Sequence, residues 1–93
     1  MPSFSLLGDY LGIPAYILFD SSVEKSALSS TFATNNNVPR TVASIHHSVA
    51  ELSASGPVMI PAIGGWYHSC LPLVVTHLPR YDVLLGSDWF EAC

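Results

Sequence analysis

One carboxylate, at the end of an apolar segment, is the side chain of this sequence best placed to do chemistry. The segment Ala15–Phe19 is apolar throughout, and Asp20, Ser21 and Ser22 follow it directly. A short apolar run of this kind predicts a buried strand, which would bring the carboxylate to the edge of a hydrophobic core. A carboxylate in such a place can act as a general acid or base. A second apolar segment, Tyr81–Trp89, lies near the other end of the chain.

Asp20 also has an ordinary structural interpretation. An aspartate that follows a strand often accepts backbone N–H groups in the next turn, and serines such as Ser21 are common turn residues. The residue types alone leave both interpretations open.

Length and composition indicate a single folded domain over residues 1–93. Hydrophobic residues make up 49% of the chain and charged residues only 11%, so the sequence is too apolar to be a disordered tail. Two interpretations remain for this apolar composition. The chain is either a small apolar β domain, or one whose surface is partly covered by a partner such as a second copy.

Charge and hydropathy exclude several classes of partner. Three basic residues stand against seven acidic ones, and the basic residues do not cluster. We therefore expect no nucleic-acid binding, which needs grouped cations to neutralise phosphates, and no binding to an anionic membrane surface. No apolar run approaches the about 20 residues that span a bilayer. The start of the sequence lacks a basic region before an apolar one, so we expect no signal peptide.

Cysteines and histidines predict neither a metal site nor a cofactor site. Cys70 and Cys93 have no metal-ligand spacing and form no disulfide framework, which indicates a reducing, intracellular setting, the cytoplasm. Cys70 is expected to be a small buried residue. His46 and His47 are adjacent, so on a strand they would point to opposite faces.

The expected elements are mostly strands. Gly12 can take a positive φ in a tight Leu11–Gly12 turn, and Gly64–Gly65 is a second hairpin signal. Strands are predicted over residues 3–10, 14–19, 41–49, 57–63, 66–76 and 81–85. A short helix through residue 33 would be capped by Ser29 or Ser30, and a helix turn through residue 91 would be capped by Ser87. The fold class is therefore all-β, a closed barrel or a sandwich with one or two short helices.

The order and spacing of several motifs resemble a known family across nearly the whole chain. The motifs are Gly12-Ile13-Pro14, Leu18-Phe19-Asp20-Ser21, Ser26 through Ala33, Val38-Pro39, Ile63-Gly64-Gly65 and Tyr81 through Trp89. In this order they resemble a retropepsin-like aspartic protease of the Ty3/gypsy retrotransposon type. The sequence departs from that family at Ser22, where the family has glycine.

The resemblance implies a homodimeric hydrolase that cleaves an extended peptide without a cofactor. Asp20 from each copy would form the catalytic pair, and Ser21 would hold the loop by hydrogen-bonding across the dimer. A flap over about residues 48–57 would cover the peptide. Gly86 would let the last strand pass close behind the active loop, and Trp89 would anchor the core. Asp82 and Asp88 are expected to be solvated or capping residues.

Ser22 decides between two functions for such a domain. A left-handed backbone at this position would cost a side chain about 1–2 kcal/mol, which a fold can absorb. A displacement of about 1 Å in the active loop can cost on the order of 100-fold in rate. The alternative is therefore a catalytically inactive dimerisation or peptide-binding domain, a degenerate or domesticated retroelement relic. An unrelated small β adaptor domain is the third possibility.

Overall fold

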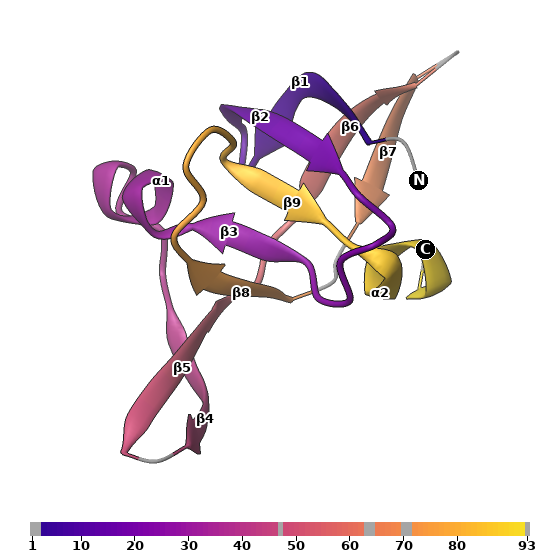
Figure 1. The fold of residues 1–93 in the computed structure, drawn as a ribbon. Coiled ribbons are helices and arrows are strands. Elements are labelled where there is room, and N and C mark those ends of the chain that lie inside the picture. Colours follow the sequence, from indigo (N-terminus) through magenta and orange to yellow (C-terminus); the bar gives the residue numbers. More distant parts are fainter. Residues whose placement is uncertain (1–2, 47, 63–64, 70–71, 93) are drawn as a thin grey trace.

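The computed structural model of the chain describes residues 3–46, 48–62, 65–69 and 72–92, and these form one sheet with two short helices (Figure 1). The strands are β1 (Phe4–Tyr10), β2 (Ile13–Phe19), β3 (Ala27–Ser29), β4 (Thr41–His46), β5 (Val49–Ala54), β6 (Val58–Ala62), β7 (Gly65–Ser69), β8 (Leu73–Thr76) and β9 (Val83–Leu85). The helices are α1 (Ser30–Asn35) and α2 (Ser87–Ala92). The all-β class with two short helices is thus confirmed.

The first hairpin forms as predicted. β1 and β2 pair antiparallel from Phe4 opposite Phe19 to Tyr10 opposite Ile13. Leu11 and Gly12 join them with φ angles of 54° and 77°. Two consecutive positive φ angles are typical of the tight turns that follow the right-handed twist of a hairpin.

Strand β9 brings the two ends of the chain together. It pairs parallel with β2, with Phe19 opposite Leu85, and antiparallel with β3 on its other side. Because β2 and β9 are parallel, their carboxyl ends lie at the same edge of the sheet. The residues that follow them, Asp20 and Gly86, therefore start two adjacent connections.

Both predicted helices are present. The Ser29 side chain accepts a hydrogen bond from the Phe32 N–H (3.2 Å) and caps α1, as expected for a serine at this position. Helix α1 ends at Asn35, and Asn37 takes a left-handed φ of 52°. Helix α2 follows Gly86 and covers the range predicted near the end of the chain.

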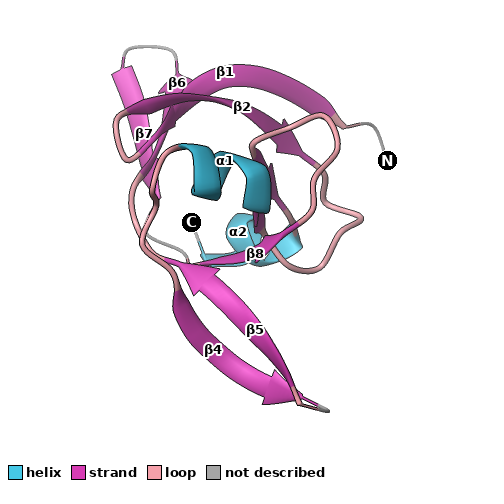
Figure 2. Cartoon of the chain, turned by 90° about the vertical axis from the view of Figure 1, so that its left-hand side faces the viewer, coloured by secondary structure: helices cyan, strands magenta, loops and turns pink. Residues whose placement is uncertain are grey.

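The segment 41–49, predicted as one strand, instead contains β4, a turn and the first residue of β5. β4 and β5 pair antiparallel, with His46 opposite Val49, and Ser48 takes a φ of 64° in the turn between them. No glycine, proline or asparagine marks this turn in the sequence. The hairpin of residues 41–54 projects from the rest of the molecule (Figures 1 and 2). The range 48–57, over which a flap is predicted, contains only the second strand of this hairpin.

Other boundaries also differ from the prediction. The range 66–76 contains two strands with different neighbours, because β7 pairs with β6 whereas β8 pairs with β3 and β5. Pro72, which has no N–H to donate, lies directly before β8. The Gly64 turn and Cys70 lie outside the described residues. The three-residue strand β3 was not predicted.

The sheet is not closed within the described part of the chain. Its strand order is β4-β5-β8-β3-β9-β2-β1-β6-β7, with β4 and β7 at the two ends. Of the two predicted forms, a closed barrel or a sandwich, the closed barrel is therefore wrong. The core lies mainly under the central strands, and its largest fully buried apolar residues are Tyr10, Ile17, Leu28, Val58, Leu73, Val83 and Leu85.

Candidate active site

Asp20 is held at the carboxyl end of β2 by the backbone of β9. Its N–H donates to the Leu85 carbonyl oxygen (3.0 Å), which continues the pairing of the two strands by one residue. The preceding residue, Phe19, is buried, stacks on Phe4 with ring centroids 4.6 Å apart, and meets Trp89 edge to face at 5.6 Å. Asp20 itself is half-buried, so a fixed backbone presents its carboxylate at the surface. Trp89, 8% exposed within the core, is the anchor that was predicted.

Ser22 makes two hydrogen bonds to a single oxygen of Asp20. The Ser22 N–H lies 3.0 Å and the Ser22 hydroxyl 2.5 Å from Asp20 Oδ1. An aspartate that accepts from the residue two positions later forms an Asx turn. These bonds, first from the hydroxyl and then from the N–H, lower the pKa of Asp20 below its usual value. Both bonds thus favour the ionised form of this carboxyl group.

The backbone at Ser22 carries no left-handed strain. The described non-glycine residues with positive φ are Leu11, Asn37 and Ser48. The cost considered for a side chain at position 22 therefore does not apply, and Ser22 is exposed. The difference from glycine lies in the added hydroxyl. Ser21, between the two, is half-buried, and within the described part of the chain its hydroxyl has no hydrogen-bond partner.

The loop after Asp20 is fastened to the start of α2 through backbone groups. Val23 donates its N–H to the Asp20 carbonyl (3.2 Å) and accepts from the Ser87 N–H (2.7 Å). Gly86 lies so close that an added Cβ would be 2.5 Å from the Val23 carbonyl oxygen. The predicted close approach at Gly86 is confirmed, because only glycine fits against this loop without displacing backbone.

Ser26, which was not singled out as a site residue, anchors the far end of the loop. It is 1% exposed. Its hydroxyl donates to Asp88 Oδ1 (2.6 Å) and accepts from the Gly86 N–H (2.9 Å), while its N–H also donates to Asp88. A buried polar group needs such partners. A serine and an aspartate 62 positions apart give no local signal in the sequence.

The two other acids near this site have structural partners. Asp88 Oδ1 also accepts from the Trp89 N–H (2.7 Å). Asp82 Oδ2 accepts from the Tyr16 N–H (2.9 Å). Both carboxylates therefore accept backbone N–H groups, as expected for residues of the capping type.

An apolar cavity of about 200 Å³ opens beside the strand that carries Asp20. Leu18 lines it from β2, and alternate residues of a strand face the same side, so Leu18 and Asp20 share a face. Leu84, opposite Leu18 on β9, lines it too. Leu78, Pro79, Arg80 and Tyr81 complete the lining. The lining of this cavity suits an apolar group.

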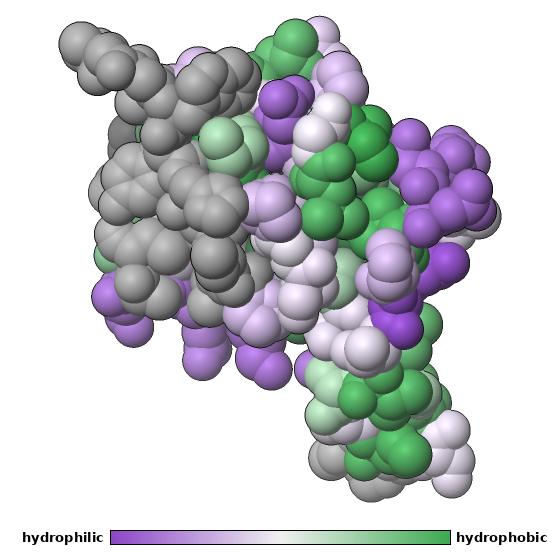
Figure 3. Space-filling view, turned by 180° about the vertical axis from the view of Figure 1, so that it is seen from behind, coloured by the Kyte–Doolittle hydropathy of each residue, from purple (hydrophilic) through white to green (hydrophobic). Residues whose placement is uncertain are grey.

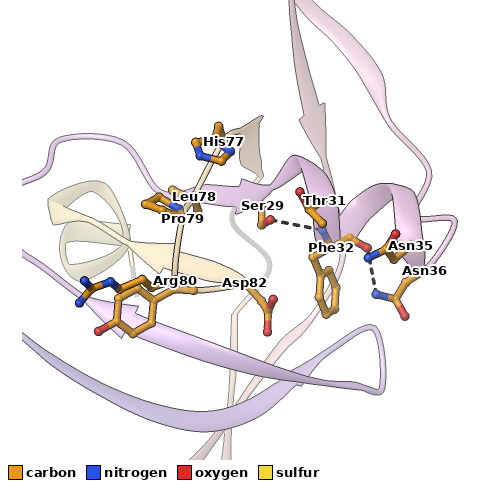
Figure 4. Close-up of a pocket in the computed structure, with 11 residues that line it drawn as sticks. Ser29, Thr31, Phe32, Asn35, Asn36, His77, Leu78, Pro79, Arg80 and Asp82 are labelled. Atoms are coloured by element: carbon orange, nitrogen blue, oxygen red, sulfur yellow. Dashed lines mark hydrogen bonds between the residues drawn. The ribbon is translucent and has the colours of Figure 1, made fainter.

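A second, more polar cavity of about 290 Å³ lies between α1 and the segment 77–82 (Figure 4). His77 lines it at one side and Asn35 and Asn36 at the other, and Asp82 and Phe32 line it between them (Figure 4). Among the described residues, no group of three His, Cys, Asp or Glu side chains could hold a metal ion.

Exposed apolar side chains gather on the projecting hairpin. Val42, Ile45 and Val49 are 57%, 72% and 68% exposed, and the hairpin forms an apolar lobe in the space-filling view (Figure 3). Phe4, Tyr16 and Phe90 are further large exposed apolar residues. None of the described helices has the length and hydropathy needed to cross a membrane.

Solved structures share this fold, whereas no protein-family model and no curated protein matches the sequence. The retroviral protease-like domain of Ddi1 from Leishmania major aligns with a TM-score of 0.64 and 12% identity, over 99% of this chain and 76% of that one. The EIAV protease complexed with the inhibitor HBY-793 aligns with a TM-score of 0.64 and 18% identity, over 98% of this chain and 88% of that one. At these identities the likeness concerns the fold, and the retropepsin-like fold expected from the motifs is confirmed.

Proposed function

We propose that residues 1–93 form a single retropepsin-like aspartic endopeptidase domain of the Ty3/gypsy type, active as a homodimer. The observation that carries the proposal is the position of Asp20. On a fold shared with retroviral protease-like domains, this carboxylate lies at the end of a core strand, in a loop fastened to β9 and α2. One chain supplies one such loop, so two copies related by a two-fold axis would supply the pair of acids.

The reaction needs one ionised and one protonated Asp20. Two carboxyl groups about 3 Å apart cannot both ionise, so the pair shares one proton. The carboxylate takes a proton from water, the water oxygen bonds to the peptide carbonyl carbon, and the other Asp20 donates its proton to the carbonyl oxygen. The resulting gem-diol then returns a proton to one Asp20 while the other protonates the nitrogen. The C–N bond breaks, a carboxylic acid and an amine leave, and the pair again holds one proton.

The proposed substrate is an extended peptide with an apolar residue next to the cleaved bond. The cavity lined by Leu18 and Leu84 would hold that side chain beside Asp20. The hairpin of residues 41–54 would take the role of the flap, and a peptide could bind beneath it through main-chain hydrogen bonds. The exposed Ile45 and Val49 on this hairpin would be covered in the complex.

Ser21 is proposed to hold the two active loops together. Its hydroxyl, next to Asp20 in each copy, would hydrogen-bond across the two-fold axis. The proposal keeps the cytoplasmic location indicated by the cysteines, and it needs neither metal nor cofactor.

Peptide cleavage by matched variants tests this function. A mixed peptide library is incubated at about pH 5, where a carboxyl pair can hold one proton, with the native chain, Asp20→Asn and Glu24→Gln. Glu24 is an exposed acid of the same loop, so its loss controls for charge. We expect Asp20→Asn to abolish cleavage and Glu24→Gln to retain it. Equal turnover by the native chain and Asp20→Asn would assign the cleavage to a contaminant and overturn the proposal.

The Ser22 hydroxyl favours a second candidate, a catalytically inactive dimerisation or peptide-binding domain. It occupies an oxygen of Asp20 that the acid pair would otherwise use. Such a domain would dimerise and bind extended peptides but would release them intact under all conditions. Binding of library peptides by native chain and Asp20→Asn alike, with no cleavage from pH 3 to pH 8, would support this candidate.

A further inference from the structure

The bond from the Ser22 hydroxyl to Asp20 is unusually close for a surface loop. At 2.5 Å between the two oxygens, it falls in the range of charge-assisted bonds between a hydroxyl and a carboxylate, which are roughly twice as strong as neutral ones. The Ser22 N–H reaches the same oxygen at 3.0 Å. A glycine at this position would supply the N–H alone, so the second bond depends on the serine hydroxyl.

Besides Ser22, the loop after Asp20 carries two charged residues, Glu24 and Lys25, and both are exposed. From β9, Asp20 meets the Leu85 carbonyl. The acid that α2 directs at this loop, Asp88, is bound to Ser26. The amino terminus lowers the pKa of Asp20 less than the two Ser22 bonds do. The two Ser22 bonds are therefore the main cause of the lowered pKa of Asp20.

We propose that the Ser22 hydroxyl is a positioning group that holds Asp20 ionised in acid solution, and that it thereby confines peptide cleavage to acidic pH. The second part rests on the proposed function. The protein would then bind a peptide without cleaving it near neutral pH and would cleave it in acid.

The expected shift of the active pH range follows from the proton that the acid pair must share. A hydrogen bond to the charged form of a carboxyl favours that form. In a dimer, each Asp20 would accept a hydrogen bond from the hydroxyl of its own Ser22. These two bonds offset the repulsion between the two carboxylates. Both apparent pKa values of the pair then fall, and they belong to the pair rather than to either residue. The singly protonated pair, which is the active form, exists only at lower pH.

Carboxyl NMR titration of Asp20 in the native chain, Ser22→Ala and Ser22→Thr tests the first part directly. Ser22→Ala removes the hydroxyl but keeps the N–H and Cβ, whereas Ser22→Thr keeps all three. Position 22 is exposed, so both variants should fold, which amide spectra verify. We expect the Asp20 titration midpoint to move to higher pH in Ser22→Ala and to stay near the native value in Ser22→Thr. An unchanged midpoint in Ser22→Ala would overturn the inference.

The pH–rate profile tests the second part with the same proteins. We expect the activity of Ser22→Ala to extend to higher pH, so that its rate at pH 7 relative to pH 5 exceeds the native ratio. Ser22→Thr should keep the native profile. The same profile for all three proteins would refute the role of the hydroxyl in cleavage. Absence of cleavage in all three would overturn the proposed function, whereas the NMR titration would still decide the ionisation of Asp20.

Discussion

Replacing Gly86 by alanine should displace the loop that carries Asp20. The added Cβ would lie 2.5 Å from the Val23 carbonyl oxygen and 3.2 Å from the Lys25 carbonyl carbon. Neither is the end of a flexible side chain, and the Val23 carbonyl also accepts the 2.7 Å bond from Ser87. Overpacking of this kind costs about 1–3 kcal/mol, and weakening that hydrogen bond adds about 0.5–1.5 kcal/mol.

The expected loss is therefore roughly 1.5–4.5 kcal/mol of unfolding free energy, or a fall in Tm of about 6–36 °C for a chain of this size. Gly12→Ala is the matched control. Its φ is 77°, but no atom lies within 4 Å of the added Cβ, so it should cost only the about 1–2 kcal/mol of a left-handed backbone. Thermal unfolding measures both losses, and amide chemical shifts locate them. A Gly86→Ala protein with native stability and unshifted loop amides would refute the close approach.

Three further variants test the core and the site. Ser26→Ala removes a buried hydroxyl that both donates and accepts, and should cost about 1–3 kcal/mol in urea unfolding, whereas the partly exposed Ser30→Ala should cost much less; equal losses would contradict the anchoring role. The Tyr10 hydroxyl is buried with no hydrogen-bond partner among the described residues, so Tyr10→Phe should cost at most about 1 kcal/mol. Burial raises the pKa of Tyr10, so its contribution to the free energy of unfolding is fully present below the usual tyrosine pKa and is lost as pH rises through the raised value. Tyr10→Phe should therefore lose less stability than the native chain between pH 8 and pH 11. An identical alkaline loss in both proteins would count against this. Leu18→Ala should reduce cleavage after large apolar residues relative to small ones, and an unchanged preference in the library would separate the apolar cavity from substrate binding.

Turns and caps with a specific chemical signal were predictable from the sequence. Gly12 tolerates the positive φ that the first hairpin requires, and the Ser29 side chain caps α1. Each depends on one residue and its immediate neighbours. Local chemistry of this kind is visible without knowledge of the fold.

Elements that depend on distant partners were not predictable. β3 has only three residues and is stabilised by β8 and β9, which lie far along the chain. The hairpin tip near Ser48 turns at a serine with positive φ, a conformation that few residues other than glycine, asparagine and aspartate take readily. The sequence of 41–49 therefore gives no local signal for the turn.

The candidate site shows the same division. Asp20 stood out because an apolar strand precedes it, whereas Ser26 acquires its role from Asp88, 62 positions away. In the sequence, Ser22 raises the question of a left-handed backbone where the family has glycine. The structure shows no positive φ at Ser22, and instead its hydroxyl donates a hydrogen bond to the Asp20 carboxylate.

Mixing native and Asp20→Asn chains tests most directly whether both copies supply an acid. The two are combined in equal amounts at a fixed total concentration at which sedimentation shows dimers, and cleavage is compared with that of native chain alone. If each active site needs one Asp20 from each copy, only native–native pairs cleave, and about a quarter of the activity should remain. A residual activity of about one half would mean that each chain acts alone, and would contradict the two-copy site.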